Sequence, residues 1–471
     1  MSFYNIINGE RRSSSNVHQC TDPRTEEPLW DAPLATQEDL DEAVAAARAA
    51  QPEWAKTTVA HRQSLLKKLG ERLEEHRQEL VDCLMRETGK SALIAGIDVT
   101  NSIGQCDYYA KNALKDEITF EDDTLTIVAT HQPLGVVAAI CPWNFPIILS
   151  NIKVVSALVT GNAIILKPSP LAPYAVLKSI EFTHDLFPPG ILQVLNGGAE
   201  LGVSITSHPG VDKISFTGSS ATGRRVHESC AKSGKKVTLE MSGNDPGIVC
   251  EDVDIKQVAS LIATGSLFNG GQMCVCTKRI YVHESIYDEF LKELVDVVEA
   301  GFVINKDPTA PTVFGPLSNR MQFEIASAML EDCKSKGFNI VSGGDIPNDG
   351  GYWITPTIIS KPDEQSMIVQ KEQFGPLVPV MSWSDEDDVI ARANASDSGL
   401  GAAVYSSDPV RAQRLARRIE SGTVFINMAE IPHVGGYFSG RKSSGYGGEM
   451  GMQGLLSYCH TQSLQIRKSA T

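Results

Sequence analysis

"LTIVATHQPLGVVAAICPWNFP", residues 125–146, decides the fold class of this 471-residue chain. It is rich in β-branched residues and ends in a proline-flanked loop. "NAIILKPSP" at residues 162–170 repeats this pattern of an apolar run followed by prolines. "KISFTGS" at residues 213–219 continues the series, and helix-like segments occupy residues 171–186 and 221–232 between these strands. Short apolar strands that alternate with helices of this length predict a parallel sheet with right-handed crossovers.

A second alternating series follows residue 274 and includes "RIYVH", "PTIIS", "GPLVPVMSW" and "GTVFIN". The chain therefore contains two α/β units, with neither internal repeats nor a low-complexity linker between them. Near the N-terminus, Thr36 is placed to cap a helix, and residues 61–88 predict a long helical region that ends at Gly89. Residues 461–467 alternate apolar with polar side chains, which predicts an edge strand paired either within the monomer or with another subunit.

The bulk composition argues against several classes of function. A net charge of −15 argues against a nucleic-acid partner, because phosphate binding needs a basic face. We expect no membrane partner either, since no apolar run approaches the ~18 residues of a membrane span and the first residues lack the pattern of a signal peptide. Ten scattered cysteines are typical of free thiols in a reducing compartment, so a cytoplasmic location is expected.

Two cysteines, Cys274 and Cys276, are separated by one residue in "FNGGQMCVCTKRIYV", residues 268–282. Three interpretations are open: one thiol is a nucleophile, the two form a metal or disulfide pair, or both are core residues in a tight turn. A structural zinc ion would want four ligands, and no CxxC or HxxxH spacing accompanies this pair. We therefore expect no metal site.

Further polar residues lie at predicted strand ends. Asn144 is held between two prolines that fix the backbone, and the Gly218–Ser219 turn would open a helix whose free N–H groups suit a phosphate. Glu240 and Lys167 each end a strand-like run. Taken singly, each has a structural alternative: an ordinary β-turn-α connection, a loop asparagine, or a solvated strand end.

Together these motifs resemble the aldehyde dehydrogenase superfamily over nearly the whole chain. The Gly-Gln-x-Cys core at residues 271–274 is the most specific signature of that family, and the spacing from Glu240 to Cys274 agrees with it. The other matching motifs occur in the order typical of the family: Asn144, Lys167, the "FTGS" turn, Glu240, the cysteine loop and "KEQFGP" at residues 371–376.

The resemblance implies catalytic roles. Cys274 looks like the nucleophile, which would attack an aldehyde to give a thiohemiacetal and, after hydride transfer to a nicotinamide, a thioester. The Asn144 amide and the Cys274 backbone N–H would stabilise the oxyanion, and Glu240 would activate the water that releases a free carboxylic acid. Glu449 resembles a family glutamate that helps to shuttle protons toward this base. The implied activity is NAD(P)-dependent oxidation of a small-molecule aldehyde.

The resemblance also implies an NAD site. Lys167 matches a lysine that binds the adenosine ribose, Ser219 lies where the pyrophosphate approaches, and Glu372 matches the acid that holds the nicotinamide ribose. Pro170 stands where many NAD-preferring members have a Glu that repels a 2′-phosphate, so the resemblance leaves NADP open as well. The expected cofactor-binding residues are Trp143, Lys167, Ser169, Gly218, Ser219, Glu372 and Phe374.

The residue six positions before Cys274 bears on the substrate. Family members that oxidise succinic semialdehyde usually have an Arg there to hold the distal carboxylate, whereas this chain has Phe268. Phe145, Phe268, Tyr437 and Phe438 match substrate-tunnel positions, which predicts an uncharged aliphatic or aromatic aldehyde. The alternatives are a semialdehyde of amino-acid or polyamine catabolism, and a catalytically silent member that acts as a binding or structural protein.

Cys276, Ser242 and Ser439 raise separate questions about the site. Family members that oxidise succinic semialdehyde have a similar Cys-x-Cys pair that can close to a disulfide, so Cys276 is a candidate redox partner of Cys274. The alternative is that Cys276 is a small buried residue. Ser242 and Ser439 interrupt glycine patterns of the family, which predicts altered loop geometry near the substrate funnel.

The fold class implied by the resemblance is α/β with three parts: a Rossmann-like doubly wound parallel sheet, a second α/β catalytic domain and a small β oligomerisation extension. Residues 120–130 would pair with the C-terminal strand and mediate a homodimer or homotetramer. The active site would lie where the two large domains meet. The expected boundaries are 1–117 and 134–243 for the cofactor-binding domain, 244–443 for the catalytic domain, and 118–133 and 456–471 for the extension.

Overall fold

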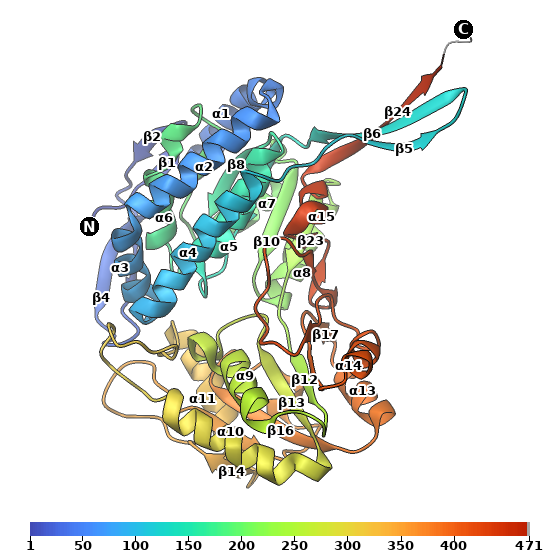
Figure 1. Cartoon of the computed structure of the whole chain (residues 1–471). Coiled ribbons are helices and arrows are strands. Elements are labelled where there is room, and N and C mark those ends of the chain that lie inside the picture. Colours follow the sequence, from blue (N-terminus) through green and yellow to red (C-terminus); the bar gives the residue numbers. More distant parts are fainter. Residues whose placement is uncertain (469–471) are drawn as a thin grey trace.

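A computed structural model describes residues 1–468 (Figure 1). Two bodies, each built around a sheet, lie one above the other in Figure 1, and a long β-hairpin paired with the C-terminal strand projects from the upper body. Both sheets are mainly parallel with helices packed against them, so the predicted α/β class is confirmed. Among residues 1–468, no helix has the length and apolar character needed to cross a membrane.

The first sheet has the strand order β2-β1-β9-β8-β7-β10-β11-β22, and its strands from β9 to β11 run parallel. The chain moves outward from β7 through β8 to β9 and then returns to place β10 beside β7, so the sheet is doubly wound. The crevice at such a reversal, at the carboxyl ends of the strands, is where ligands bind in this class of sheet. The strands are β1 Asn5–Ile7, β2 Glu10–Arg12, β7 Val136–Ile140, β8 Ala163–Lys167, β9 Leu192–Val194, β10 Lys213–Thr217, β11 Lys236–Glu240 and β22 Gly445–Tyr446.

Local sequence signals set several helix limits around this sheet. Thr36 caps α1 through a reciprocal capping box with Asp39, and Gly89 ends α3 in the left-handed conformation, both as predicted. The predicted helical region 61–88 is two helices, because the chain breaks at His76, and the helix expected at 171–186 is shorter. The helices are α1 Gln37–Lys56, α2 Val59–Glu75, α3 Arg77–Thr88, α4 Ala92–Tyr109, α5 Pro146–Val159, α6 Tyr174–Glu181, α7 Ala199–Ser207, α8 Ser220–Ala231 and α15 Gly451–Leu456.

The second sheet has the order β14-β15-β16-β13-β12-β18-β19, with only β14 antiparallel to its neighbour. Its core strands are almost fully buried, as parallel strands covered on both faces require. Its strands are β12 Asp245–Val249, β13 Thr277–His283, β14 Asn339–Ser342, β15 Thr357–Ser360, β16 Leu377–Trp383, β18 Ala403–Tyr405 and β19 Phe425–Ile426. The helices of this body are α9 Ile255–Leu267, α10 Tyr287–Gly301, α11 Arg320–Ser335, α12 Met367–Gln370, α13 Glu386–Asn394 and α14 Pro409–Ala416.

The projecting extension consists of β5 (Glu117–Glu121), β6 (Leu125–Pro133) and β24 (Cys459–Arg467). β24 pairs antiparallel with β6 along its whole length, so the tail strand has its partner within the monomer. The expectation that residues 120–130 form one strand against the tail is wrong in detail, because Phe120 lies in β5, on the far side of β6. Residues 469–471 of the predicted extension lie outside the described part of the chain.

Candidate active site

Three predicted site residues lie at one edge of the first sheet. β7, β10 and β11 are neighbours in parallel register, with Ile140 opposite Phe216 and Thr217 opposite Glu240. The segments that leave β7 and β10, which carry Asn144 and Ser219, therefore start beside the end of β11. Parallel pairing thus brings Asn144 and Glu240 to the same edge of the sheet, although they are nearly 100 positions apart in the sequence.

The cysteine loop approaches this edge from the second body. A short 3₁₀ turn (Phe268–Gly271) contains three successive residues in the left-handed region, ending at Gly271 with φ 75°. A Cβ on Gly271 would lie 2.4 Å from the backbone oxygen of Gly375, so only glycine fits there. The Gln272 side chain fixes the turn, because its amide donates to the Asn269 carbonyl at 2.9 Å and its oxygen accepts from the Ser318 N–H at 2.8 Å.

Asn144 is held against this loop. Its Nδ2 donates to the Gln272 carbonyl oxygen at 2.9 Å, and the side chain is buried. A side-chain amide has two N–H groups, so this bond orients the amide and leaves the second N–H available to a ligand. The bond links the first body to the cysteine loop of the second.

Two cavities, each of about 380 Å³, meet at three residues. The first opens toward the crevice of the first sheet and is lined by polar groups that include Ser242 and Glu372. The second is lined mainly by apolar side chains from α4, α5 and the cysteine loop. Both are lined by Asn144, Glu240 and Cys274. The proposed catalytic residues therefore lie at the junction of a polar cleft and an apolar tunnel.

Burial raises the pKa of two groups at this junction, the Glu240 carboxyl and the Cys274 thiol. It raises the pKa of Glu240 to about 8, and one carboxyl oxygen, Oε1, has no hydrogen-bond partner. Burial, together with the neighbouring Glu240, raises the pKa of the Cys274 thiol well above its usual range. At neutral pH the resting site therefore holds a thiol and a protonated carboxyl, so the thiol must lose its proton before it can act as a nucleophile.

A buried ion pair lies behind Glu240, and the sequence analysis found only one partner. Lys153, in α5, is fully buried and donates to Glu449, while Thr217 Oγ1 accepts from its ammonium at 2.9 Å. Ser215 Oγ donates to the same Glu449 carboxylate at 2.7 Å. Glu449 also lines the apolar cavity. A lone Lys within the apolar run "PIILSNIKVVSALV" was the signal that could have identified Lys153.

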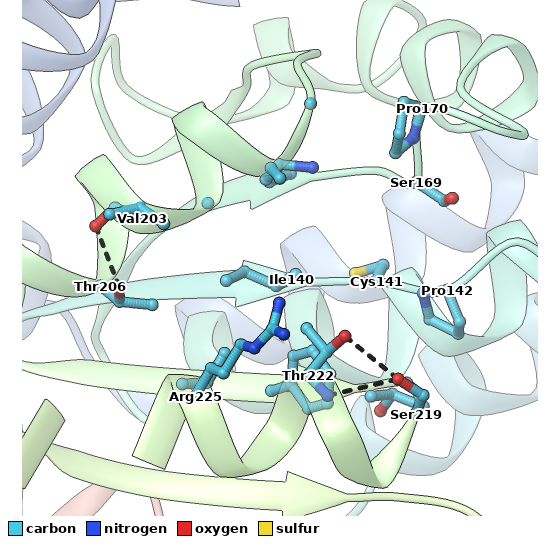
Figure 2. Close-up of a pocket in the computed structure, with 18 of the residues that line it drawn as sticks. Ile140, Cys141, Pro142, Ser169, Pro170, Val203, Thr206, Ser219, Thr222 and Arg225 are labelled. Atoms are coloured by element: carbon cyan, nitrogen blue, oxygen red, sulfur yellow. Dashed lines mark hydrogen bonds between the residues drawn. The ribbon is translucent and has the colours of Figure 1, made fainter. Parts of the chain in front are cut away.

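A larger groove of about 620 Å³ continues from the polar cleft, between α7 and α8 (Figure 2). On the α7 side the groove is lined by three small residues, Gly198, Ala199 and Gly202. Because these residues have little or no side chain, this side of the groove is open. Ser219 caps α8, with its Oγ accepting from the Thr222 N–H at 3.3 Å. The predicted cofactor residues Trp143, Lys167, Ser169, Gly218 and Ser219 line this groove.

The remaining predicted cofactor residues, Glu372 and Phe374, line the polar cleft instead. Glu372 Oε1 accepts from the Gly243 N–H at 3.2 Å, and burial raises the pKa of this carboxyl to about 7. The Phe374 ring packs edge-on against Trp143, with the ring centroids 5.3 Å apart. The cleft and the groove share Trp143 and Ser219, so they form one continuous path to Cys274.

Three of the four predicted substrate residues line the apolar cavity. Phe145 and Phe268 stack in parallel with centroids 6.4 Å apart, and Phe438 lies farther along the wall. Tyr437 does not line this cavity and is 39% exposed. Its neighbour Phe438 begins the short strand β20 (Phe438–Ser439), which pairs with β23 (Gly448–Glu449), whereas Tyr437 precedes that strand.

Cys276 and the two unusual serines lie in different places. Cys276 is fully buried and lines neither cavity, and burial raises the pKa of its thiol to about 11. Ser242 lines the polar cleft, where its Oγ accepts from the Ser220 N–H at 3.4 Å. Ser439 lies in β20, outside the residues that line the apolar cavity.

A pair of buried acids near the cysteine loop was not identified from the sequence. Asp245 and Glu430 are both 1% exposed, and none of their four carboxyl oxygens has a hydrogen-bond partner. Burial and their mutual repulsion raise the pKa of the Glu430 carboxyl well above its usual range. Within residues 1–468, no three His, Cys, Asp or Glu side chains are grouped in a way that could hold a metal ion.

Comparison with known proteins gives a consistent result. The profile of the aldehyde dehydrogenase family matches residues 10–464. Aldehyde dehydrogenase LUC3 of a Fusarium species is 40% identical, and the alignment covers 99% of each chain. The chloroplastic betaine aldehyde dehydrogenase of Amaranthus hypochondriacus is 36% identical, over 96% of this chain and 94% of that one. The NAD⁺ complex of an aldehyde dehydrogenase from Bacillus cereus superposes with a TM-score of 0.95 at 32% identity, covering 100% of this chain and 97% of that chain. The chain therefore belongs to the aldehyde dehydrogenase family and is an NAD(P)-dependent enzyme.

Proposed function

We propose that this enzyme oxidises an uncharged aliphatic or aromatic aldehyde to the carboxylic acid through a thioester on Cys274. The observation that carries the proposal is the junction of the two cavities at Asn144, Glu240 and Cys274. An aldehyde in the apolar tunnel and a nicotinamide in the polar cleft would meet at the same sulfur. Each residue at the junction has a chemical property suited to one step.

The groove and cleft fit a dinucleotide. Their sizes fall in the range of small-ligand sites, roughly 300–1,000 Å³, and the open α7 wall leaves room for a flat base. The N-terminal N–H groups of α8, at Ser219, would receive the pyrophosphate, and Glu372 would hold the nicotinamide ribose. When bound, NAD or NADP accepts a hydride.

Cys274 would form the covalent bond. Its thiolate adds to the carbonyl carbon, and the second N–H of Asn144 stabilises the resulting oxyanion together with the Cys274 backbone N–H. Because Asn144 is already bonded to the Gln272 carbonyl, the amide is oriented before substrate binds. Loss of hydride from the carbon that carries this oxyanion then leaves the thioester, and the only proton released is the one that left the Cys274 thiol.

Glu240 would complete the cycle as general base. As a carboxylate it takes a proton from water, the hydroxide adds to the thioester carbonyl, and collapse of the adduct releases the acid and the Cys274 thiolate. The Lys153–Glu449 pair lies behind Glu240 and would receive the proton. A base with a pKa of about 8 is well matched to proton transfer near neutral pH.

The chemistry of the tunnel favours an uncharged substrate. Phe145, Phe268 and Phe438 line it, and it has no arginine or lysine to hold a distal carboxylate. The third acid on its wall, besides Glu240 and Glu449, is Glu430, and burial together with the neighbouring Asp245 raises the pKa of this carboxyl well above its usual range. Burial of apolar substrate surface against this wall should therefore stabilise the complex by ~25 cal/mol per Å².

A second candidate substrate class comes from the relatives. The betaine aldehyde dehydrogenase of Amaranthus, 36% identical to this chain, acts on a cationic aldehyde by its name. A panel of hexanal, benzaldehyde, betaine aldehyde and succinic semialdehyde, each with NAD and with NADP, separates the classes by kcat/KM. We expect hexanal or benzaldehyde to rank first. A charged aldehyde in first place would overturn the substrate proposal, and no reduction with any aldehyde would indicate a catalytically silent member.

Residues 1–117 and 134–243 would bind the cofactor, 244–443 would form the catalytic domain, and the projecting strands would join subunits into a homodimer or homotetramer. Four large apolar side chains are exposed on the extension, Ile118, Phe120, Leu464 and Ile466, and such a surface favours burial against another copy. Light scattering of the purified protein tests this assembly, and a monomer would contradict it. A cytoplasmic location remains our prediction, which microscopy of the tagged protein checks.

A further inference from the structure

Arg225 has no assigned role at the proposed cofactor site, yet it lines the groove between α7 and α8. Figure 2 shows its side chain extending from α8 across the groove toward Ile140 of β7, with Pro170 on the opposite side. Within the described residues, its guanidinium takes part in no ion pair or hydrogen bond. An unpaired guanidinium with its five donors is well suited to an oxyanion of matching shape.

The surrounding charges leave the groove positive, although the protein carries a net charge of −15. Glu228 is the one acid among the groove residues, and Lys232 pairs with it at 3.8 Å. Lys167 contributes a second cation, because burial lowers its pKa only to about 8. Pro170 adds neither a charge nor an N–H. Arg225, Lys167 and Lys232 therefore outnumber Glu228, the single carboxylate among the described residues that line this groove.

The position of Arg225 along α8 limits which anion it can meet. Arg225 lies six residues beyond the cap residue Ser219, which places its backbone about 9 Å farther along the helix axis at 1.5 Å per residue. A pyrophosphate at the α8 N-terminus would therefore leave Arg225 at the nucleoside end of the dinucleotide. That end of NAD carries no anion, whereas NADP carries a phosphate monoester on the ribose 2′-oxygen.

We propose that Arg225 binds the 2′-phosphate of NADP and makes NADP the more tightly bound cofactor of this enzyme. The inference rests on the proposed function, because it requires the groove to hold the nucleoside end of the cofactor. A guanidinium can donate two parallel hydrogen bonds to phosphate, which a lysine ammonium cannot do with the same geometry. Ser169 and Thr222 line the same groove and offer hydroxyl groups near the ribose.

The test is direct binding of NAD and NADP to the full-length protein by isothermal titration calorimetry, with no turnover required. We compare wild type, Arg225→Gln and the matched control Arg224→Gln, whose side chain is exposed and does not line the groove. Loss of a hydrogen-bonded charge predicts that Arg225→Gln weakens NADP binding about 10- to 100-fold and leaves NAD binding unchanged. The control keeps both affinities, and Arg225→Lys gives an intermediate NADP affinity.

Other outcomes overturn the proposal. Equal weakening of NAD and NADP by Arg225→Gln would mean that the guanidinium stacks on the base instead of pairing with a phosphate. Unchanged affinities for both, or a wild type that binds NAD more tightly than NADP, would also overturn it while leaving the proposed function intact. A wild-type protein that binds neither dinucleotide would overturn the proposed function together with this inference.

Discussion

The polar cleft and the apolar tunnel are similar in size, share three residues and otherwise have opposite chemistry. Glu372, Ser242 and the α8 N-terminus line the cleft, whereas phenylalanine and aliphatic side chains line the tunnel. The reactive groups are therefore common to both cavities, whereas different residues would select the cofactor in the cleft and the aldehyde in the tunnel. Substitutions at the junction should therefore change the chemistry, and substitutions on either wall should change one affinity alone.

The largest effect is expected when the nucleophile is removed. Cys274→Ala should reduce aldehyde oxidation by on the order of 10⁴-fold or more, as loss of a covalent nucleophile does elsewhere, because no thiohemiacetal can form. NAD(P)H formation at 340 nm measures this, and calorimetry should show unchanged cofactor binding. A Cys274→Ala enzyme that turns over like wild type would place the chemistry outside the junction.

Glu240→Gln should slow hydrolysis while leaving acylation intact. The amide cannot accept a proton, so we expect a burst of one NAD(P)H per site, followed by a steady rate reduced ~10²- to 10⁴-fold. In the wild type, the rate of thioester hydrolysis should rise as the pH increases through about 8, because only the deprotonated carboxyl acts as a base. Stopped-flow absorbance tests both statements, and a hydrolysis rate that falls over this pH range would exclude Glu240 as the base.

Asn144→Ala should affect the transition state more than binding. Removal of one oxyanion donor typically lowers kcat by about 10²- to 10³-fold. The KM for aldehyde should change little, since the apolar wall is intact. The variant also lacks the bond to the Gln272 carbonyl. Asn144→Asp keeps the shape but has no N–H to donate, so it separates loss of the donor from loss of volume. Retention of full kcat in both variants would remove Asn144 from the mechanism.

Phe268→Ala tests the tunnel wall alone. It removes the ring stacked on Phe145, which should raise the KM for hexanal or benzaldehyde about tenfold. The affinity for cofactor should not change, because Phe268 is absent from the cleft. A parallel loss of cofactor affinity would show that the two cavities are not independent.

Cys276→Ser is expected to have the smallest effect. The buried Cys276 thiol has a pKa of about 11, so little thiolate is present to trap an oxidised Cys274. We expect turnover, peroxide inactivation and recovery with dithiothreitol to match the wild type. Faster or less reversible inactivation of the variant would instead support a protective Cys274–Cys276 disulfide.

Much of the fold could be predicted because it depends on local patterns. The alternation of apolar runs and helices located β7, β8 and β10 and the second series of strands, and Thr36 and Gly89 set helix limits through their capping chemistry. The break at His76 was not visible, because helix-forming residues continue on both sides of it. The turn between β5 and β6 was also missed, because residues 120–130 were expected to form a single strand.

Long-range contacts account for what the sequence analysis missed at the site. Lys153 and Glu449 are 296 positions apart, and their pairing depends on the packing of α15, which follows β23, against α5. Asp245 and Glu430 become a buried pair only when the segment after β19 returns to the cysteine loop. Tyr437 and Phe438 have similar aromatic character in sequence, and in the structure only Phe438 lies in β20 and lines the tunnel.

The most direct test of the account is the mass of the peptide that contains Cys274 after the Glu240→Gln variant is mixed with hexanal and cofactor and quenched in acid. We predict a mass increase equal to one hexanoyl group on Cys274, formed at the same rate as the burst of NAD(P)H. A burst of NAD(P)H with an unmodified Cys274, or with the acyl group on another residue, would contradict the proposed thioester at the junction of the two cavities.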